Sequence, residues 1–275
     1  MSTVAADRKR ALITGGASGL GRAIALRVAR DGWYIAVADV NEAGSQETVR
    51  QIQAAGGDGH TEHLDVSQRE QWAQLRSRLE AAWPAIDLLV NNAGVSGAGE
   101  IGEFSLDDWQ WMLGINLMGT IYGCHTFIDW LKRNPRGGAI INTASLAAMI
   151  SAPTMAAYNV AKSGIVSLSE TLYAEVAKHN VSVTVLCPSF FQTPLLENSR
   201  MYTDDQQRIA ANSMRNARFT ADDVARAALR AMRRKFLYVV VPAKGRIWWR
   251  IKRFIPFEFM WFLGKRYAKG LPDSL

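Results

Sequence analysis

The sequence predicts a single doubly wound α/β domain built on a parallel sheet, and two observations predict it. Short apolar runs rich in Val, Ile and Leu alternate with longer amphipathic stretches along most of the chain. These runs are continuously apolar, which is typical of strands that helices cover on both faces. Strands that alternate with helices in this way pair in parallel through right-handed crossovers.

The predicted elements follow one another regularly. Strands are expected at 11–13, 35–38, 86–90, 139–141, 181–186 and 236–241, with a further strand ending at Leu64. Helices are expected at 20–30, 42–55, 68–82, 106–132, 158–178 and 222–232. Ser67 is expected to cap the third helix. The inner side of the fourth helix is expected to carry Trp109, Met112, Leu113 and Leu117. No Pro/Ser-rich linker interrupts this order, so we expect one domain over 1–243 and a C-terminal extension over 244–275.

The positive charge of the chain is concentrated in that extension. The 275 residues carry 32 Lys and Arg against 25 Asp and Glu, a formal net charge of +7. Residues 244–275 hold eight basic and two acidic side chains and contribute +6, so the body is nearly neutral. A nucleic-acid-binding protein would be expected to spread basic groups over a face of the fold. We therefore expect no nucleic-acid partner.

The other totals indicate an ordinary globular protein. Apolar residues make up 48% of the chain and charged residues 21%, which suits a sizeable core. Cys124 and Cys187 are the only cysteines and do not make a disulfide framework. The N-terminus lacks an apolar signal segment, and no apolar run reaches the ~18 residues of a membrane span. We expect a reduced, cytoplasmic protein without a metal site.

A glycine-rich turn follows the first predicted strand and opens the first helix. Gly15, Gly19 and Gly21 permit a tight turn and remove side chains where a pyrophosphate would approach. The helix N-terminus, at Ser18 and Leu20, offers free N–H groups and a partial positive charge to phosphates. The position of this turn between strand and helix predicts dinucleotide binding.

The second predicted strand ends at Asp39, where a carboxylate can bind the ribose hydroxyls of the adenosine and would repel a 2′-phosphate. No Arg or Lys adjoins Asp39 in the sequence, and Ser18 rather than a basic residue stands in the turn. Both features favour NAD over NADP. Asp65 and Val66 follow the third strand and either reach the adenine or cap the next helix.

Tyr158 and Lys162 lie four residues apart on a predicted helix and share one face. A free tyrosine, with a pKa of about 10, is a poor base at neutral pH. A neighbouring ammonium and a positively charged nicotinamide would both favour the phenolate, so we expect them to lower its pKa. Ser145 follows the strand at 139–141, at the sheet edge where such folds bind ligands.

These motifs resemble the short-chain dehydrogenase/reductase family. The segment 14–21 matches the cofactor turn of the family, and 91–94 (Asn-Asn-Ala-Gly) matches the motif after its fourth strand. Asn116 falls where the family has a helix asparagine, and Ser145, Tyr158 and Lys162 complete the active-site set. The resemblance covers residues 8–242 and implies a Rossmann-like fold.

The resemblance also implies roles for individual residues. Tyr158 is expected to act as acid/base, Ser145 to bind the substrate oxygen, and Lys162 to hold the nicotinamide ribose. Asn116 either holds a water that relays protons from Lys162 or merely distorts its helix. Further cofactor contacts are implied for Asn92, Ala93, Gly94, Pro188 and Thr193.

One position departs from the pattern of the family. Pro188 is followed by Ser189 where the family usually has glycine, and two aromatic residues come next. Ser189 is expected to restrict the backbone at that point, beside the expected nicotinamide contacts.

The segments where the family binds its substrate are apolar in this chain. They supply Leu146, Met149, Ile150, Met155, Phe190, Phe191, Leu195, Leu196 and Met201, with no Arg or Lys before Arg200. An apolar alcohol or ketone is therefore the expected substrate, unless several of these residues simply belong to the core.

Three classes of function follow from these features. The first is an NAD-dependent oxidoreductase that interconverts an apolar secondary alcohol and its ketone. The second is an NADPH-dependent carbonyl or 3-oxoacyl reductase, against which Asp39 argues. The third is a nonenzymatic NAD-binding scaffold, against which the complete active-site set argues. The resemblance implies a homodimer or homotetramer built on the two long helices at 106–133 and 155–178.

The extension interleaves aromatic and basic residues. On a helix, Ile247, Trp248, Ile251 and Phe254/Ile255 form one stripe, with Arg246, Arg250 and Arg253 toward another. Such a helix suits peripheral contact with anionic lipid through 244–269. The alternatives are that the stripe packs on the body, where it would roof the substrate pocket, or on a sister subunit.

Overall fold

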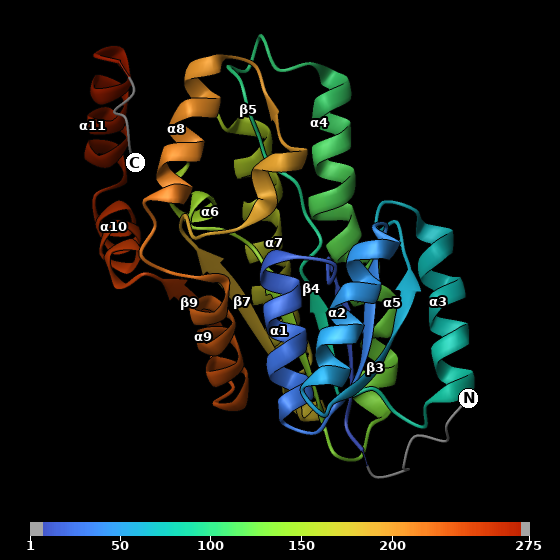
Figure 1. Ribbon diagram of the computed structural model, residues 1–275. Helices are drawn as coiled ribbons and strands as arrows, with labels where there is room; N and C mark the ends of the chain where they lie inside the picture. Colours follow the sequence, from blue (N-terminus) through green and yellow to red (C-terminus); the bar gives the residue numbers. More distant parts are fainter. Residues whose placement is uncertain (1–7, 271–275) are drawn as a thin grey trace.

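The computed structural model describes residues 8–270, and its centre is a seven-stranded parallel sheet (Figure 1). The spatial order of the strands is β3-β2-β1-β4-β6-β7-β9, so the chain reverses its direction of winding between β1 and β4. Ligands of open α/β sheets bind at such a switch point, outside the carboxyl ends of the strands. The strands are β1 Arg10–Thr14, β2 Tyr34–Asp39, β3 Asp58–His63, β4 Leu88–Asn91, β6 Gly138–Thr143, β7 Val181–Pro188 and β9 Tyr238–Val241.

Helices cover both faces of this sheet, which confirms the predicted doubly wound architecture. Successive side chains of a strand point to opposite faces, so Ile13 packs in one core and Leu12 in the other. The first core is closed by α1 Gly19–Arg30, α2 Glu42–Ala54 and α9 Ala221–Arg233. The second is closed by α3 Arg69–Ala82, α5 Gly119–Arg133 and α7 Ala156–Glu175.

The continuous helix expected at 106–132 is interrupted in the structure. It consists of α4 Leu106–Leu113, a π-helical turn Gly114–Met118, and α5. Asn116 lies in the π turn, fully buried, and its amide group bonds the backbone of Val95 in both directions, each at 2.9 Å. A tertiary contact therefore accompanies the break, and the sequence period could not show it.

The start of α3 also differs from the prediction. The residue that precedes the helix is Gln68, and Ser67 does not cap it. The Ser67 hydroxyl donates instead to the Asp65 carboxylate at 2.7 Å, and the Ser67 backbone N–H donates to the same oxygen at 3.0 Å. Asp65 thus closes a turn that leads into α3.

A small lobe above the carboxyl ends of the strands contains elements that the sequence analysis missed (Figure 1). It holds α8 Asp204–Arg215, the short helix α6 Ala147–Ile150, and a two-stranded parallel sheet of β5 Gly97–Ala98 and β8 Arg200–Met201. The side chain of Thr203 caps α8 by accepting from the Gln206 N–H, and Asp204 and Asp205 occupy its first turn. These are recognisable helix-start signals.

The extension forms two helices, α10 Ala243–Phe254 and α11 Pro256–Ala268; residues 271–275 lie outside the described part of the chain. α10 meets the body at Gly245, where a Cβ atom would lie 3.0 Å from Leu146, and at Trp249, whose ring centre is 5.1 Å from that of Tyr238. The predicted stripe lies elsewhere: Ile247 is 57% exposed and Phe254 82% exposed.

The expectation that this stripe packs on the body of the same chain is therefore wrong. The residues of the stripe lie one position along the helix from those with which α10 contacts the body, so the two sets point in different directions. Within residues 8–270, no helix combines the length and apolar character needed to cross a membrane.

Candidate active site

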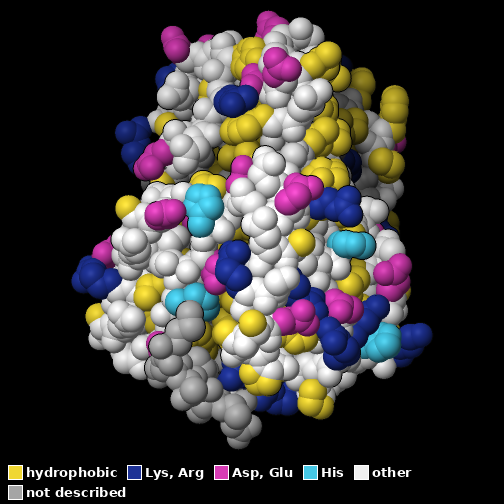
Figure 2. Space-filling model, turned by 90° about the vertical axis from the view of Figure 1, so that its right-hand side faces the viewer, with side chains coloured by type: hydrophobic (Ala, Val, Ile, Leu, Met, Phe, Trp, Pro, Cys, Tyr) yellow, Lys and Arg dark blue, Asp and Glu magenta, His cyan; other side chains and the backbone are white. Residues whose placement is uncertain are grey.

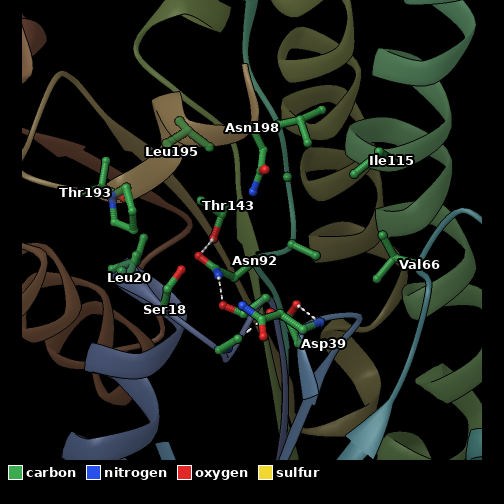
Figure 3. A pocket seen from close by; sticks show the side chains of 18 of the residues that line it. Ser18, Leu20, Asp39, Val66, Asn92, Ile115, Thr143, Thr193, Leu195 and Asn198 are labelled. Atoms are coloured by element: carbon green, nitrogen blue, oxygen red, sulfur yellow. Dashed lines mark hydrogen bonds between the residues drawn. The ribbon is translucent and has the colours of Figure 1, made fainter. Parts of the chain in front are cut away.

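The glycine turn between β1 and α1 forms a cradle at the carboxyl edge of the sheet (Figure 3). Gly15 and Gly19 have positive φ angles, +63° and +50°. A Cβ atom at Gly15 would lie 2.7 Å from the Ala93 Cα, and one at Gly21 would lie 2.1 Å from the Gly15 carbonyl oxygen. Ser18 precedes α1 in an extended conformation, and its side chain makes no capping bond, so the first N–H groups of the helix remain available to an anion.

Asp39 ends β2 on the wall of the same pocket. Its carboxylate accepts from the Ala17 N–H at 3.1 Å and from the Asn41 N–H at 3.0 Å, which fixes it beside the glycine turn. Arg22 follows the turn, but its guanidinium donates to Ala17 and Gly44 carbonyls and to the Thr48 hydroxyl, and it does not line the pocket.

Asp65 and Val66 lie on the pocket wall next to Asp39, as expected for residues near an adenine. The Asp65 carboxylate is engaged by the backbone and hydroxyl of Ser67, and the Val66 carbonyl accepts from the Trp72 indole at 2.9 Å. Asp65 therefore builds the turn that leads into α3 without capping the helix, and Val66 presents an apolar side chain to the pocket.

Asn92 ties three strand ends together at the centre of the pocket (Figure 3). Its side-chain amide donates to the carbonyls of Thr14 and Gly15 at 3.1 and 3.3 Å, and its amide oxygen accepts from the Thr143 hydroxyl at 3.5 Å. Ala93 continues the wall, and its N–H donates to the Thr14 hydroxyl at 3.1 Å. The motif therefore holds the glycine turn against the ends of β4 and β6.

Gly94 lies where two predicted active-site residues approach. A Cβ atom there would lie 2.7 Å from the Asn116 amide oxygen and 3.5 Å from the Lys162 Nζ. Only glycine leaves room for both groups. Two hydrogen bonds of the Asn116 amide go to the Val95 backbone and hold the pocket wall, which agrees with the alternative that Asn116 distorts its helix.

Ser145, Tyr158 and Lys162 come together at the same cavity as Asp39. Tyr158 and Lys162 line the cavity, and the Ser145 hydroxyl hydrogen-bonds Tyr158. Lys162 donates to the Thr143 carbonyl at 2.9 Å, and its Nζ lies 5.6 Å from the centre of the Tyr158 ring. All three side chains are thus positioned by β6 and α7.

Burial shifts the pKa values of both Tyr158 and Lys162. Burial raises the pKa of the Tyr158 phenol, and the hydrogen bond with Ser145 opposes this rise only in part. Burial lowers the pKa of the Lys162 ammonium to about 8. The ammonium of Lys162 donates to the Thr143 carbonyl and is not among the groups that shift the pKa of the phenol, so burial decides the direction of that shift.

This shift predicts a pH-dependent stability. An unfolded lysine releases its proton near pH 10.5, whereas folded Lys162 does so near pH 8. Between these values the unfolded chain binds more protons, so the free energy of unfolding should rise with pH. We expect urea unfolding at pH 7 and 9.5 to show this gain in wild type relative to Lys162→Met, which lacks the titrating group. A difference between the two proteins that stays constant with pH would contradict the prediction.

The segment after β7 closes the pocket from above. Pro188 and Thr193 both line it, and the Thr193 hydroxyl lies against Gly19, where a Cβ atom would come within 2.8 Å. Ser189 is not among the residues with positive φ, and its N–H donates to the Val241 carbonyl at 2.7 Å. The expected restriction therefore does not arise, because the chain at Ser189 simply extends the pairing of β7 with β9.

A second, apolar pocket lies beside the first, and residues of the segment 188–198 line both. Four of the expected substrate residues line it: Met155, Phe190, Leu196 and Met201. Phe191 and Leu195 line the first pocket, whereas Leu146, Met149 and Ile150 pack in the core under α10. The sequence analysis missed the wall that α8 supplies through Gln206, Ile209, Ala210 and Met214.

Two further polar residues, Arg200 and Asn198, lie near these pockets. Arg200 pairs with the Asp108 carboxylate and lies 4.0 Å from the centre of the Trp111 ring, so its charge is already engaged. Asn198 was not predicted, and its amide points into the first pocket (Figure 3). In the part of the chain that the structure describes, no group of His, Cys, Asp or Glu could hold a metal ion.

Known proteins are similar to this chain in sequence and in fold. The profile of the family described as short chain dehydrogenase matches residues 9–203. A 3beta-hydroxysteroid dehydrogenase of Mediterraneibacter gnavus is 32% identical over 194 residues, covering 70% of each chain. The 3beta-hydroxysteroid dehydrogenase 1 of Eggerthella lenta is 33% identical over 208 residues, covering 75% of this chain and 78% of the relative.

A solved structure agrees with both. A short-chain dehydrogenase/reductase from Burkholderia phymatum in complex with NAD is 32% identical, with a TM-score of 0.85, and the match covers 91% of this chain and 94% of that one. By its profile, its relatives and its sheet, the chain belongs to the short-chain dehydrogenase/reductase family, a family of nicotinamide-dependent oxidoreductases.

Proposed function

We propose that this protein oxidises an apolar secondary alcohol to its ketone, or reduces the ketone, with NAD as cofactor. One observation carries the proposal: Tyr158, with Ser145 bonded to it, faces the same cavity as the glycine cradle and Asp39. A bound nicotinamide cofactor supplies the hydride acceptor or donor. A proton acid/base beside such a cofactor is what alcohol oxidation requires.

The residues that line the cavity support the binding of a dinucleotide. The N–H groups at the start of α1 would bind the pyrophosphate, because no side chain caps them and the glycines of the turn pack where a Cβ atom would clash with neighbouring atoms of the chain. Asp39 would bind the adenosine ribose, with Asp65 and Val66 near the adenine. Lys162 would bind the nicotinamide ribose, and Thr193 the carboxamide.

In the oxidation direction, the Tyr158 phenolate removes the hydroxyl proton of the substrate. Ser145 donates a hydrogen bond to the substrate oxygen while the carbonyl forms. Burial alone keeps Tyr158 protonated, so its ionisation depends on positive charge from Lys162 and the oxidised nicotinamide in the same cavity. Asn116 would contribute by holding the wall at Val95 and, in our proposal, a water that relays protons from Lys162.

The two hydroxysteroid dehydrogenase relatives and the apolar second pocket support a bulky apolar substrate, of which a 3β-hydroxysteroid is one example. The test is a turnover panel with NAD and with NADP over secondary alcohols of increasing chain length and ring size, including a 3β-hydroxysteroid. We expect turnover with NAD that improves with apolar bulk. Turnover restricted to NADP would support the alternative, an NADPH-dependent reductase, and NAD binding without any turnover would support a scaffold.

The wall of the second pocket offers a separate prediction. Met214→Lys places a charge beside the substrate, so KM for apolar alcohols should rise by about tenfold with little change in kcat. The matched control is Phe236→Lys, which introduces the same charge at a side chain that is 56% exposed and outside both pockets. Equal KM values for the two variants would show that the second pocket does not bind the substrate.

We further propose a homodimer or homotetramer built on α4, α5 and α7. Hydrophobic side chains gather on the upper half of the face that carries α4, whereas charged side chains and histidines are spread over its lower half (Figure 2). On α7, Val160 and Tyr173 remain 50% and 42% exposed, which suits burial by a second copy. Sedimentation velocity counts the subunits, and a monomer would contradict this assembly.

A further inference from the structure

The helices α10 and α11, termed here the tail helices, and Ile255 between them carry more than half of the large hydrophobic side chains that are exposed among residues 8–270. Of the fifteen large hydrophobic side chains exposed among residues 8–270, eight lie between 247 and 262. They are Ile247, Trp248, Phe254, Ile255, Phe257, Met260, Trp261 and Phe262. Soluble monomers rarely gather so many exposed apolar groups in one short segment without a partner.

These side chains are exposed because the tail helices use other residues to hold their place. Gly245 and Trp249 attach α10 to the body, while Phe259, only 4% exposed, meets Trp248 with ring centres 6.0 Å apart and joins α11 to α10. Within residues 8–270 the outward faces are covered little: Phe254 is 82% exposed and Phe257 is 76% exposed.

Basic side chains border the same surface. Residues 244–270 hold eight Lys and Arg and a single acidic residue, Glu258. Arg246 and Arg250 are exposed, one position away from Ile247 and Ile251 along the same helix. On α11, Lys265 lies 3.8 Å from the centre of the Trp261 ring. Aromatic and aliphatic groups are thus flanked by cations.

We propose that the tail helices dock on the surface of an anionic lipid bilayer. Aromatic side chains insert at the level of the lipid headgroups, and Arg and Lys pair with lipid phosphates. The charge distinguishes this partner from a second copy. A symmetric contact between two tails would bring two strongly basic surfaces together, whereas an anionic membrane complements them.

The attachment of the tail decides which end of the molecule would face the lipid. Lys252 on α10 donates to the Ser151 hydroxyl at 2.9 Å, next to α6, and Tyr267 on α11 bonds the Glu100 carboxylate beside β5. Both partners belong to the lobe above the carboxyl ends of the strands, and α11 stands at the same edge of the molecule as α8 (Figure 1). Docking would therefore bring this lobe, rather than the opposite end of the sheet, close to the membrane.

Vesicle co-sedimentation of the full chain tests the proposal. We expect binding to mixed phosphatidylcholine–phosphatidylglycerol vesicles, weaker binding to pure phosphatidylcholine, and loss of binding at high salt because salt screens the charges. Phe254→Ser/Phe257→Ser should weaken partitioning at least tenfold, because two buried rings are lost. Arg246→Gln/Arg250→Gln should weaken it roughly thirtyfold on anionic vesicles alone, at about one kcal/mol for each charge.

A matched control removes the same kind of surface elsewhere. Ile101→Ser/Phe236→Ser replaces two side chains that are 75% and 56% exposed and lie outside the tail and outside α4, α5 and α7, and it should bind vesicles as wild type does. Sedimentation velocity of each variant shows its subunit count. The proposal is overturned if wild type stays in the supernatant with anionic vesicles, or if the control loses as much binding as the phenylalanine variant. It is also overturned if that phenylalanine variant loses a subunit contact that wild type has. Each outcome is independent of turnover.

Discussion

Replacing Tyr158 with Phe should lower kcat for alcohol oxidation by about a thousandfold or more, while NAD binding stays nearly unchanged. The substitution removes the only phenol oxygen that Ser145 positions in the cavity, and positioned acid/base groups contribute about 10² to 10⁴ in rate. The ring remains to fill the space, because Tyr158 is only 8% exposed and its neighbours pack around it. Steady-state turnover and a fluorescence titration with NAD separate the two effects.

The matched control lies on the same helix. Tyr173→Phe removes a phenol oxygen from α7 at a side chain that is 42% exposed and outside both pockets, so turnover should be that of wild type. Substantial activity in Tyr158→Phe would show that another group transfers the proton, and the proposed mechanism would fail even though the family assignment stands.

Replacing Asp39 with Asn should lower kcat/KM for NAD by about tenfold to a hundredfold and raise the relative use of NADP. Hydrogen bonds from the ribose hydroxyls to a charged acceptor are worth about 1.5–3 kcal/mol, and the neutral amide loses part of this. The same change removes the repulsion of a 2′-phosphate. The Ala17 and Asn41 N–H groups bond different oxygens of Asp39, so Asn keeps an acceptor for only one of them, and the loss of the other bond adds to the effect on NAD binding.

Initial rates with each cofactor measure this effect. Asp107→Ser serves as the control, because it removes a negative charge from the exposed first turn of α4, away from the cavity. Unchanged constants for NAD in Asp39→Asn, or turnover of wild type with NADP alone, would refute the role assigned to Asp39.

Most of the architecture and of the pocket could be predicted from features that are local in the sequence. Each predicted strand is present, and most of them are continuous apolar runs that satisfy burial on both faces of a parallel sheet. The exception is β3, a polar and partly buried strand at the edge of the sheet. Gly15, Gly19 and Gly21 could be recognised because part of the demand on them is local: Gly15 and Gly19 have positive φ angles, and Gly21 packs against the Gly15 carbonyl in the same turn. Tyr158 and Lys162 were paired by helical spacing alone.

The missed features depend on residues distant in the sequence. The π turn at Asn116 depends on Val95, and the second pocket depends on α8 lying over Phe190 and Met155. α8 itself had signals at Thr203–Asp205, but nothing in the sequence indicated that its apolar side would line a pocket.

By itself, the sequence determined the order of strands and helices, the glycine cradle, the residues of the active-site set and the basic, aromatic character of the tail. Only the tertiary structure decided how those residues behave. Burial, which depends on every neighbouring element, raised the pKa of Tyr158 and lowered that of Lys162. Close approach at Gly245 decided which side of α10 meets the body and left its apolar stripe facing outward. Spacing along a helix states which residues share a face, but the direction of that face is set by contacts from the rest of the chain.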